Sequence, residues 1–450
     1  MTVTAQSPYP LLEGRADVVE YLVLRGLLPL VAAATSEVEV REVTAGNMNR
    51  VFLAGGPLGS LAVKQAPPWV QVVGPEWPVD PDRIVSEART YERLAERVPE
   101  SIPRILDFDA ERHVLAMEDL SDLAVLRDVL VAELAAGADA DAAVSAGVDA
   151  AAGADEAAGV DHVALGQVVG RFVGELAAAT RRTTLGDEAH AALVAVSANP
   201  ELCALTVDVV LDEPYREHEH NRWHPALKER VRELYRDDEV RAAVAGVREA
   251  FEGRAEALLH GDLHSGSVMV GRRDGEQAVK VFDPEFSFVG PIGMDLGLFW
   301  ANLEIAALAA DALGRPELAA ERYSAVAASL DAFARAWNDP GTLDGIVADA
   351  WRFAGVEGMR RAAGFSHAAD IETLPEPARA AASVRLFDVA RAHILTGAAV
   401  RHDFARDAGV SASEPAPRAS AADGDDTAPR ASGATPTTPT APSAAPEERP

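Results

Sequence analysis

The chain has a single cysteine and no long run of apolar residues. Cys203 alone cannot form an internal disulfide or a metal site that needs several cysteines, and such scarcity is typical of a reducing cytoplasm. The apolar segment from Tyr21 to Ala34 is interrupted by Arg25 and Pro29. No segment offers the roughly 18 uninterrupted apolar residues of a membrane span, so a cytoplasmic protein without a signal peptide is expected.

Positive charge is also scarce, because 41 Lys and Arg stand against 71 Asp and Glu, a formal net charge of -30. That charge repels phosphate backbones and anionic bilayers, so neither nucleic acid nor a membrane is an expected partner. The sequence lacks a Gly-x4-Gly-Lys-Ser/Thr loop, a Gly-x-Gly-x2-Gly fingerprint and a His-Glu-x2-His helix. A P-loop ATPase, a nicotinamide enzyme and a zinc protease are therefore disfavoured.

What the sequence does have is a dense group of carboxylates between positions 260 and 285. It reads His260-Gly261-Asp262-Leu263-His264-Ser265-Gly266-Ser267, and later Asp283-Pro284-Glu285. Between them, β-type runs at Val268 to Val270 and Gln277 to Phe282 flank Asp274-Gly275, a strong hairpin signal. A turn there sets Ser267 opposite Phe282 and Gly266 opposite Asp283. The loop with Asp262 is thus expected to end beside the loop with Asp283 and Glu285.

This arrangement suits phosphoryl transfer, in which one carboxylate lies near the acceptor hydroxyl and others bind the magnesium that bridges the nucleotide phosphates. In protein kinases a base Asp is followed, after four residues, by Asn, and a metal-binding Asp comes later. Asp262 and Ser267 have that offset, and Asp283 follows across the hairpin. The alternative is that these Asp residues cap turns beside glycines, but two such motifs so close together favour chemistry.

The first part of the chain predicts one helix and then an antiparallel sheet. Apolar spacing indicates a helix from Ala16 to Leu28. Short β-rich runs separated by turn residues then follow at Val38 to Val43, Arg50 to Leu53, Ser60 to Lys64, Ile105 to Phe108 and Val114 to Met117.

Candidate nucleotide contacts lie in this sheet. Gly46-Asn47 can place backbone amides over phosphates, or it can be an ordinary hairpin turn. Lys64 can supply a cation, steadied by Glu87 on a predicted helix from Asp82 to Arg97, with Glu92 as the alternative; a solvated acidic face is the competing interpretation. The connector with Met117, Glu118 and Leu120 offers backbone groups that could hydrogen-bond an adenine edge.

From Ser121 onward the pattern is mainly helical, so the expected fold class is α+β, with a small antiparallel-sheet lobe and a larger helical lobe. Helices are predicted at Asp161 to Thr180, Pro225 to Arg236, Glu239 to Glu252, Leu298 to Ala312, Pro316 to Asn338, Leu343 to Ala363 and Glu376 to Leu395. We expect lobes at residues 1–118 and 119–407. An Ala/Gly/Asp-rich stretch within 132–159 is expected to be a flexible insertion, and the Pro/Ala/Ser/Thr-rich tail at 408–450 to be disordered.

A histidine-rich segment runs from Glu217 to His224. His220 and His224 are one helical turn apart, a spacing that can bind a metal. Asn221 and Pro225 favour a loop instead, and no cysteine lies nearby. A polar surface loop is therefore the preferred interpretation.

The loop from His260 to Ser267 and the triplet Asp283-Pro284-Glu285 resemble the aminoglycoside-phosphotransferase type of small-molecule kinases, and specifically the methylthioribose kinase family. That family has a His-Gly-Asp-Leu-His-Thr/Ser-Gly-Ser loop and an Asp-Pro-Glu metal motif. Most other relatives have a magnesium-binding Asn where Ser267 stands, whereas methylthioribose kinases use the Glu of Asp-x-Glu. The resemblance implies that Asp262 is catalytic and contacts the substrate, and that Asp283 and Glu285 bind magnesium.

Other stretches extend the resemblance over most of residues 10–400. The run from Gly46 through Asn47 and Asn49 to Phe52 resembles the family's nucleotide loop, and Lys64 lies in a strand like the one with its ATP-binding lysine. Trp77 lies in a segment like the loop that covers the active site. Arg360 and Arg361 resemble twin arginines that approach the sugar and the transferred phosphate, although adjacent arginines are more often surface charge. The stretch within 132–159 and the tail have no counterpart in the family.

The resemblance implies a protein-kinase-like fold, ATP and Mg²⁺ as cofactors, a homodimer, and phosphorylation of the C1 hydroxyl of 5-methylthioribose in methionine salvage. Alternative acceptors are an aminoglycoside, choline, homoserine or a related sugar, although paired arginines disfavour a polycation. An inactive kinase-fold binding module usually lacks the base, a metal carboxylate or the lysine, all of which are present here. A scaffold that acts through the acidic tail could coexist with catalysis.

Overall fold

The computed structural model describes residues 7–44, 48–136 and 159–404. The chain divides into two compact units, Met1–Gly409 and Val410–Pro450, and every described residue belongs to the first. Gly46, Asn47, most of the expected insertion and the tail at 408–450 lie outside the described residues. The lobe boundary near residue 118 stays a prediction, since the sheet and the helices fall in one unit.

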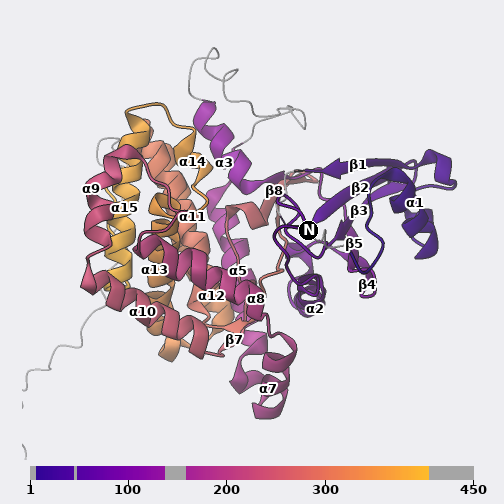
Figure 1. Cartoon of the computed structure of the whole chain (residues 1–450), viewed down its shortest axis with the longest axis horizontal. Coiled ribbons are helices and arrows are strands. Elements are labelled where there is room, and N and C mark those ends of the chain that lie inside the picture. Colours follow the sequence, from indigo (N-terminus) through magenta and orange to yellow (C-terminus); the bar gives the residue numbers. More distant parts are fainter. Residues whose placement is uncertain (1–6, 45–47, 137–158, 405–450) are drawn as a thin grey trace, which may run out of the picture. The chain divides into compact units, whose positions relative to one another are not determined.

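The N-terminal part contains a five-stranded antiparallel sheet in the order β1-β2-β3-β5-β4 (Figure 1). Its strands are β1 (Glu39–Val43), β2 (Arg50–Gly56), β3 (Gly59–Gln65), β4 (Ile105–Asp109) and β5 (Val114–Glu118). Alternate residues of β5 serve opposite faces, since Val114 and Ala116 pack with α1 (Arg15–Leu24) while Leu115 and Met117 pack with α2 (Arg83–Ala95). The expected small antiparallel sheet is therefore confirmed.

The first helix is shorter than expected, because α1 ends at Leu24 and not at Leu28. Gly26 has a φ of 70°, its N–H donates to Val23 O at 3.2 Å, and the N–H of Leu27 donates to Leu22 O at 2.8 Å. This pair of bonds is a Schellman motif, which closes a helix with a left-handed glycine. Apolar spacing continued past the end of the helix because Leu27 still packs against the same core as Leu22.

The predicted hairpin is confirmed in its register. β8 (Val268–Arg273) pairs antiparallel with β9 (Glu276–Val281), and Val268 lies opposite Val281. One step further, the N–H of Phe282 donates to Ser267 O at 3.0 Å, so the two loops meet as expected. The short strand β6 (Ala124–Val125) extends this sheet, and β7 (Ala257–Leu258) pairs with β10 (Val289–Gly290) just outside the loops.

The rest of the described chain is mainly helical, which confirms the expected fold class. Its helices are α3 (Leu126–Ala135), α5 (His162–Thr180), α6 (Arg182–Leu185), α7 (Asp187–Val196), α8 (Pro200–Thr206), α9 (Lys228–Leu234), α10 (Asp238–Gly253), α11 (Gly293–Ala312), α12 (Pro316–Trp337), α13 (Pro340–Ala363), α14 (Ala369–Glu372) and α15 (Ala378–Thr396). Among the described residues no single helix is long and apolar enough to cross a membrane. The bent pair Asp187–Val196 and Pro200–Tyr215 reaches that length and composition only when its two helices are taken together.

Two further boundaries were predicted wrongly. α11 begins at Gly293, five residues before the expected Leu298, because Gly293 and Gly297 bring it so close to α13 that a Cβ at Gly297 would collide with Ala350 O. The expected insertion also started too early. Residues 132–136 belong to α3 and its end, where Leu134 is buried and Glu133 pairs with Arg322 at 2.9 Å.

A buried carboxylate on α11 joins the last described segment to the helical core. Glu304 lies 2.9 Å from His393 Nε2 on α15 and 2.7 Å from His402 Nε2. Burial works to lower the pKa of His393, but its hydrogen bond and ion pair with Glu304 raise that pKa overall. Burial works to raise the pKa of Glu304, but the two histidines lower it overall.

We expect this pair to stabilise the fold most between the ordinary pKa values of Glu and His, about 4.3 and about 6.5. The contribution of His393 is lost as pH rises through its raised pKa, and that of Glu304 is lost as pH falls through its lowered pKa. His393→Gln should lower the free energy of unfolding by about 1.5–3 kcal/mol near about pH 6, because it removes a hydrogen bond between charged groups. The loss should be smaller near about pH 9. Urea unfolding at both pH values measures this, and an equal deficit at both would contradict it.

Candidate active site

The loop that contains Asp262 is held from behind by Asp295, a buried residue in the first turn of α11. Asp295 accepts the N–H groups of His260 at 2.7 Å and Gly261 at 3.0 Å, and His260 Nε2 contacts Phe282 O at 2.9 Å. Gly261 has a φ of 86°, and a Cβ there would collide with the carbonyl oxygen of Phe286. The loop therefore has one fixed path beside the hairpin.

Asp262 is a partly exposed residue of that loop. Its side chain is 33% exposed, and Oδ2 lies 3.4 Å from His264 Nε2. Burial works to raise the pKa of Asp262, but His264, Arg360 and Arg361 lower it well below its usual value. Ser267 uses its hydroxyl to donate to Asp262 O at 2.9 Å. Asp262 is thus an ionised carboxylate, open on one side, in a loop fixed by its neighbours.

Lys64 on β3 lies between two of the predicted carboxylates. Its Nζ donates to Glu87 Oε2 at 2.6 Å and also contacts Asp283 Oδ1. The Lys64 side chain is 7% exposed, and although burial works to lower its pKa, Asp283 and Glu87 raise it overall. The alternative partner, Glu92, is exposed. The structure therefore places Glu87, and not Glu92, beside the lysine.

The carboxylates of Glu87, Asp283 and Glu285 form one cluster, with an oxygen of each within 4.8 Å of the others. Asn49 donates to Glu285 Oε2 at 2.7 Å, and Arg83 Nε lies 3.5 Å from the same oxygen. Burial and the nearby Asp283 charge raise the pKa of Glu285. Among the described residues the second oxygen of Glu87 has no hydrogen-bond partner although it is buried. The nearby cations do not balance the negative charge of these carboxylates, and carboxylate oxygens are the ligands that a hard divalent cation prefers. Asp283 and Glu285 could hold such an ion.

Asp283 has a strained backbone that fixes its direction. Its φ is 66°, in the left-handed region that few residues other than glycine adopt, and its N–H donates to the Tyr91 hydroxyl at 2.9 Å. Nearby, the Asn199 side chain donates to Glu285 O at 2.8 Å. Contacts from α2 and from the segment before α8 thus set the Asp-Pro-Glu turn.

Arg360 and Arg361 lie at the C-terminal end of α13, joined by one buried carboxylate. Glu357 accepts from Arg360 Nε at 2.8 Å and from Arg361 Nε at 2.7 Å. Burial works to raise the pKa of Glu357, but the two arginines lower it to about 2. Both arginine side chains are 12% exposed, so they are not surface charge, and both lower the pKa of Asp262.

Two groups of predicted residues show fewer links to this centre. Trp77 is 38% exposed in a loop closed by the bridge between Trp69 and Pro78, and no described contact joins its side chain to Asp262. In the connector, Met117 is buried and the Glu118 N–H already donates to Arg104 O at 2.8 Å. Leu120 O accepts from Leu123 N. The cover loop and the adenine contacts stay predictions.

Sequence reasoning missed four residues that hold the centre together. They are Arg83 beside Glu285, Asn199 at the Asp-Pro-Glu turn, Asp295 behind the catalytic-type loop, and Glu357 between the arginines. Two of them had a signal. Asp295 is a lone carboxylate within an apolar helix start, and Glu357 precedes the arginines by three and four residues, which places it on their face of a helix.

Comparison with known proteins matches the sequence of this chain to enzymes. Residues 39–337 match the sequence pattern of the family described as "Phosphotransferase enzyme family". A methylthioribose kinase from Geobacillus kaustophilus is 32% identical over 351 residues, which cover 74% of this chain and 80% of the relative. One from Bacillus cereus is 31% identical over 352 residues, covering 75% and 82%. Among solved structures, an ethanolamine kinase from Plasmodium vivax has a TM-score of 0.43 at 10% identity, covering 85% of this chain and 89% of that one.

Proposed function

Because the chain belongs to the phosphotransferase enzyme family, and within it to the methylthioribose kinases, we propose that it transfers the γ-phosphoryl group of ATP to the C1 hydroxyl of 5-methylthioribose. The observation that supports this most is the convergence of two groups. Lys64 contacts Asp283, whose carboxylate clusters with that of Glu285. The loop with Asp262 is bonded to the residue before Asp283, because the N–H of Phe282 donates to Ser267 O and the Ser267 hydroxyl donates to Asp262 O.

Asp262 is proposed to accept or orient the proton of the sugar hydroxyl. Its carboxylate is ionised and partly exposed, while the hydrogen bonds of His260, Gly261 and Ser267 fix the loop. A base held at hydrogen-bond reach of the acceptor hydroxyl increases the rate by typically about 10² to 10⁴. The low pKa of Asp262 keeps the base unprotonated at neutral pH and favours an orienting role beside that of proton acceptor.

The second group is proposed to hold the nucleotide phosphates. Lys64 contacts the carboxylates of Glu87 and Asp283. When ATP binds, the Lys64 ammonium would donate to a phosphate oxygen in place of Asp283, while Glu87 keeps it in position. Asn49 would lie next to the phosphates, because its amide contacts Glu285. Asp283 and Glu285 would bind Mg²⁺, which when bound neutralises charge on the β- and γ-phosphates.

The substrate side is proposed to include the two arginines. Glu357 neutralises part of their charge and fixes both guanidinium groups at the end of α13. The remaining positive field, which together with His264 lowers the pKa of Asp262, attracts an anionic ligand, tolerates a neutral one and repels a polycationic aminoglycoside. Trp77 is proposed to cover the sugar once the site is filled.

A substrate panel tests this proposal. Coupled ADP release should give the highest kcat/KM with 5-methylthioribose among that sugar, ribose, choline, homoserine and an aminoglycoside. Ribose is the matched control, because it has the same C1 hydroxyl and differs in having a C5 hydroxyl in place of the methylthio group. If another member of the panel gave the highest kcat/KM, that compound would replace 5-methylthioribose as the proposed substrate. If no member caused ADP release, the kinase proposal would be contradicted.

The location and assembly of the enzyme belong to the same proposal. We expect it to act in the cytoplasm, which the single cysteine supports, and to form the homodimer that the family resemblance implies. Light scattering on the purified full chain would give twice the 47.4 kDa chain mass for a dimer.

A further inference from the structure

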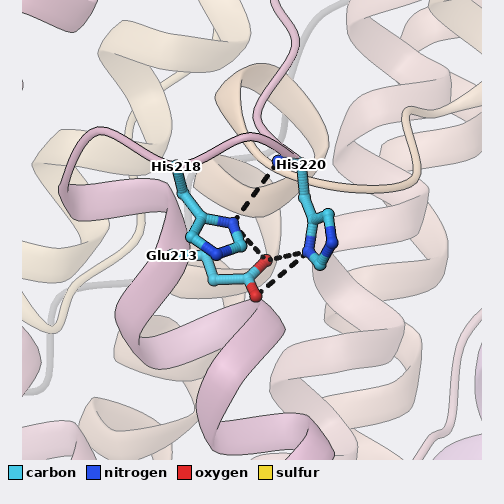
Figure 2. Close-up of side chains that lie close together, drawn as sticks. All are labelled: Glu213, His218 and His220. Carbon is cyan, nitrogen blue, oxygen red and sulfur yellow. Dashed lines mark hydrogen bonds and ion pairs between the residues drawn. The ribbon is translucent and has the colours of Figure 1, made fainter.

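A second cluster of possible metal ligands lies outside the site described above. Glu213 belongs to a 3₁₀ turn (Glu213–Tyr215), and His218 and His220 lie in the loop that follows it. Figure 2 shows both imidazole rings converging on the Glu213 carboxylate. The loop prediction for this segment is confirmed. His224, the helix-spaced partner considered from the sequence, instead pairs with Glu376 at 2.7 Å.

The separations between each histidine and Glu213 are close to those around a tetrahedral ion. Nδ1 of His220 lies 3.1 Å from both Glu213 oxygens, and Nδ1 of His218 lies 3.5 Å from Oε2. One ligand atom from each residue lies within 4.8 Å of the others. Zinc with bonds of about 2.0–2.2 Å has tetrahedral ligand atoms roughly 3.3–3.5 Å apart. A small shift of the exposed His220 ring would therefore admit the ion.

The charge of Glu213 is poorly balanced without a cation. The residue is 5% exposed, and in the described part of the chain no lysine or arginine forms an ion pair with its carboxylate. Its neighbour Arg216 pairs with Asp212 instead. A buried carboxylate needs a group that neutralises its charge. A divalent ion would do so.

His218 also has a nitrogen without a good partner. Its Nδ1 lies 3.4 Å from the backbone N–H of His220 and 3.5 Å from Glu213. Both separations exceed the roughly 2.7–3.2 Å of good hydrogen bonds. Among the described residues this nitrogen accepts only that long hydrogen bond from the His220 N–H, and a metal ion on the carboxylate side would replace it.

We propose that Glu213, His218 and His220 form a zinc-binding site, distinct from the magnesium site, with one coordination position left to solvent. Two imidazoles and one carboxylate are a ligand set that zinc uses, whereas magnesium prefers oxygen alone. The open position faces solvent through His220, which lines a cavity of about 320 Å³ together with residues 364–367.

The place of the site suggests what the ion does. Residues 364–367 follow α13, the helix with Arg360 and Arg361 at its end, and Arg361 Nη1 donates to Ser366 O at 2.9 Å. The backbone N–H of Arg222 donates to Gly364 O at 3.2 Å, so the histidine loop is already bonded to that end of the helix. Bound zinc would fix the loop against the segment that supports the arginines.

Zinc titration of the purified full chain, stripped of metal and free of ATP and Mg²⁺, tests the proposal. We expect one Zn²⁺ per chain, and Co²⁺ in its place should show the strong visible absorption of four-coordinate cobalt. Loss of a partner that only orients a ligand costs about 10–100-fold in affinity, so His220→Ala or Glu213→Gln, which remove a ligand, should cost at least about 100-fold. Thermal melting without metal checks that both variants fold.

Two variants of the same loop serve as matched controls. His224→Ala removes a histidine that pairs elsewhere, and Glu217→Gln removes an exposed carboxylate, so both should keep the affinity of the unmodified chain. The proposal is overturned if no stoichiometric binding occurs, or if His220→Ala binds zinc as tightly as His224→Ala does. Because no step uses ATP or a sugar, the result does not depend on the kinase activity.

Discussion

Asp262→Asn is expected to lower kcat by about 10² to 10⁴ and to leave the affinity for ATP nearly unchanged. The amide keeps the shape of the side chain but can no longer accept a proton from the sugar hydroxyl. The loop should persist, since Asp295, His260 and Ser267 hold it through backbone groups that the substitution does not alter. Single-turnover phosphoryl transfer and equilibrium ATP binding measure the two quantities separately.

Asp274→Asn is the matched control for that variant. It is the same substitution in the turn of the hairpin that follows the Asp262 loop, at an exposed residue with a φ of 54°, where Asn is well tolerated. It should behave like the unmodified chain. If Asp262→Asn also turned over at the unmodified rate, Asp262 would have no role as base or orienting group.

Asp283→Asn should remove the dependence of nucleotide binding on Mg²⁺. Asn tolerates the left-handed φ of 66° at this position and keeps one oxygen for Lys64, so the change removes mainly the charge that a divalent ion needs. Loss of a residue that only hydrogen-bonds to a metal ligand already lowers metal affinity by about 10–100-fold. We therefore expect the Mg²⁺ concentration that half-maximally strengthens ATP binding to rise by at least about 100-fold, so that ordinary Mg²⁺ concentrations no longer affect that binding.

ATP binding with and without Mg²⁺, followed by calorimetry, measures this effect. Asn199→Ala is an informative companion, because in the described part of the chain the Asn199 side chain donates to the backbone oxygens of Glu285 and Ser287 and not to a carboxylate. That variant should change the Mg²⁺ requirement far less. If Asp283→Asn kept the Mg²⁺ dependence of the unmodified chain, the magnesium assignment would be wrong.

Much of the site could be predicted because its signals are local. The Asp-Gly turn fixed the hairpin register, and the register placed Ser267 opposite Phe282. Lys64 and Glu87 could be paired because each lies on the buried face of its own element, which the apolar spacing around it reveals. The same spacing failed at α1, since a glycine ended the helix while the apolar pattern continued.

Three of the four residues that sequence reasoning missed act across long separations in the chain. Arg83 reaches Glu285, and Asn199 reaches the same turn from the segment before α8. No periodic pattern marks such pairs, because each side chain is chosen by one tertiary neighbour. The histidine loop shows the same limit. Helical spacing singled out His220 and His224, whereas the actual loop brings His218 and His220 to Glu213.

The most direct test of the central claim is to identify the product formed from ATP, Mg²⁺ and 5-methylthioribose by the purified chain. Mass spectrometry and phosphorus NMR should find one sugar monophosphate for each ADP, with the phosphorus coupled to the proton on C1. ADP release that does not depend on the added sugar, or phosphate on a different hydroxyl, would contradict the account.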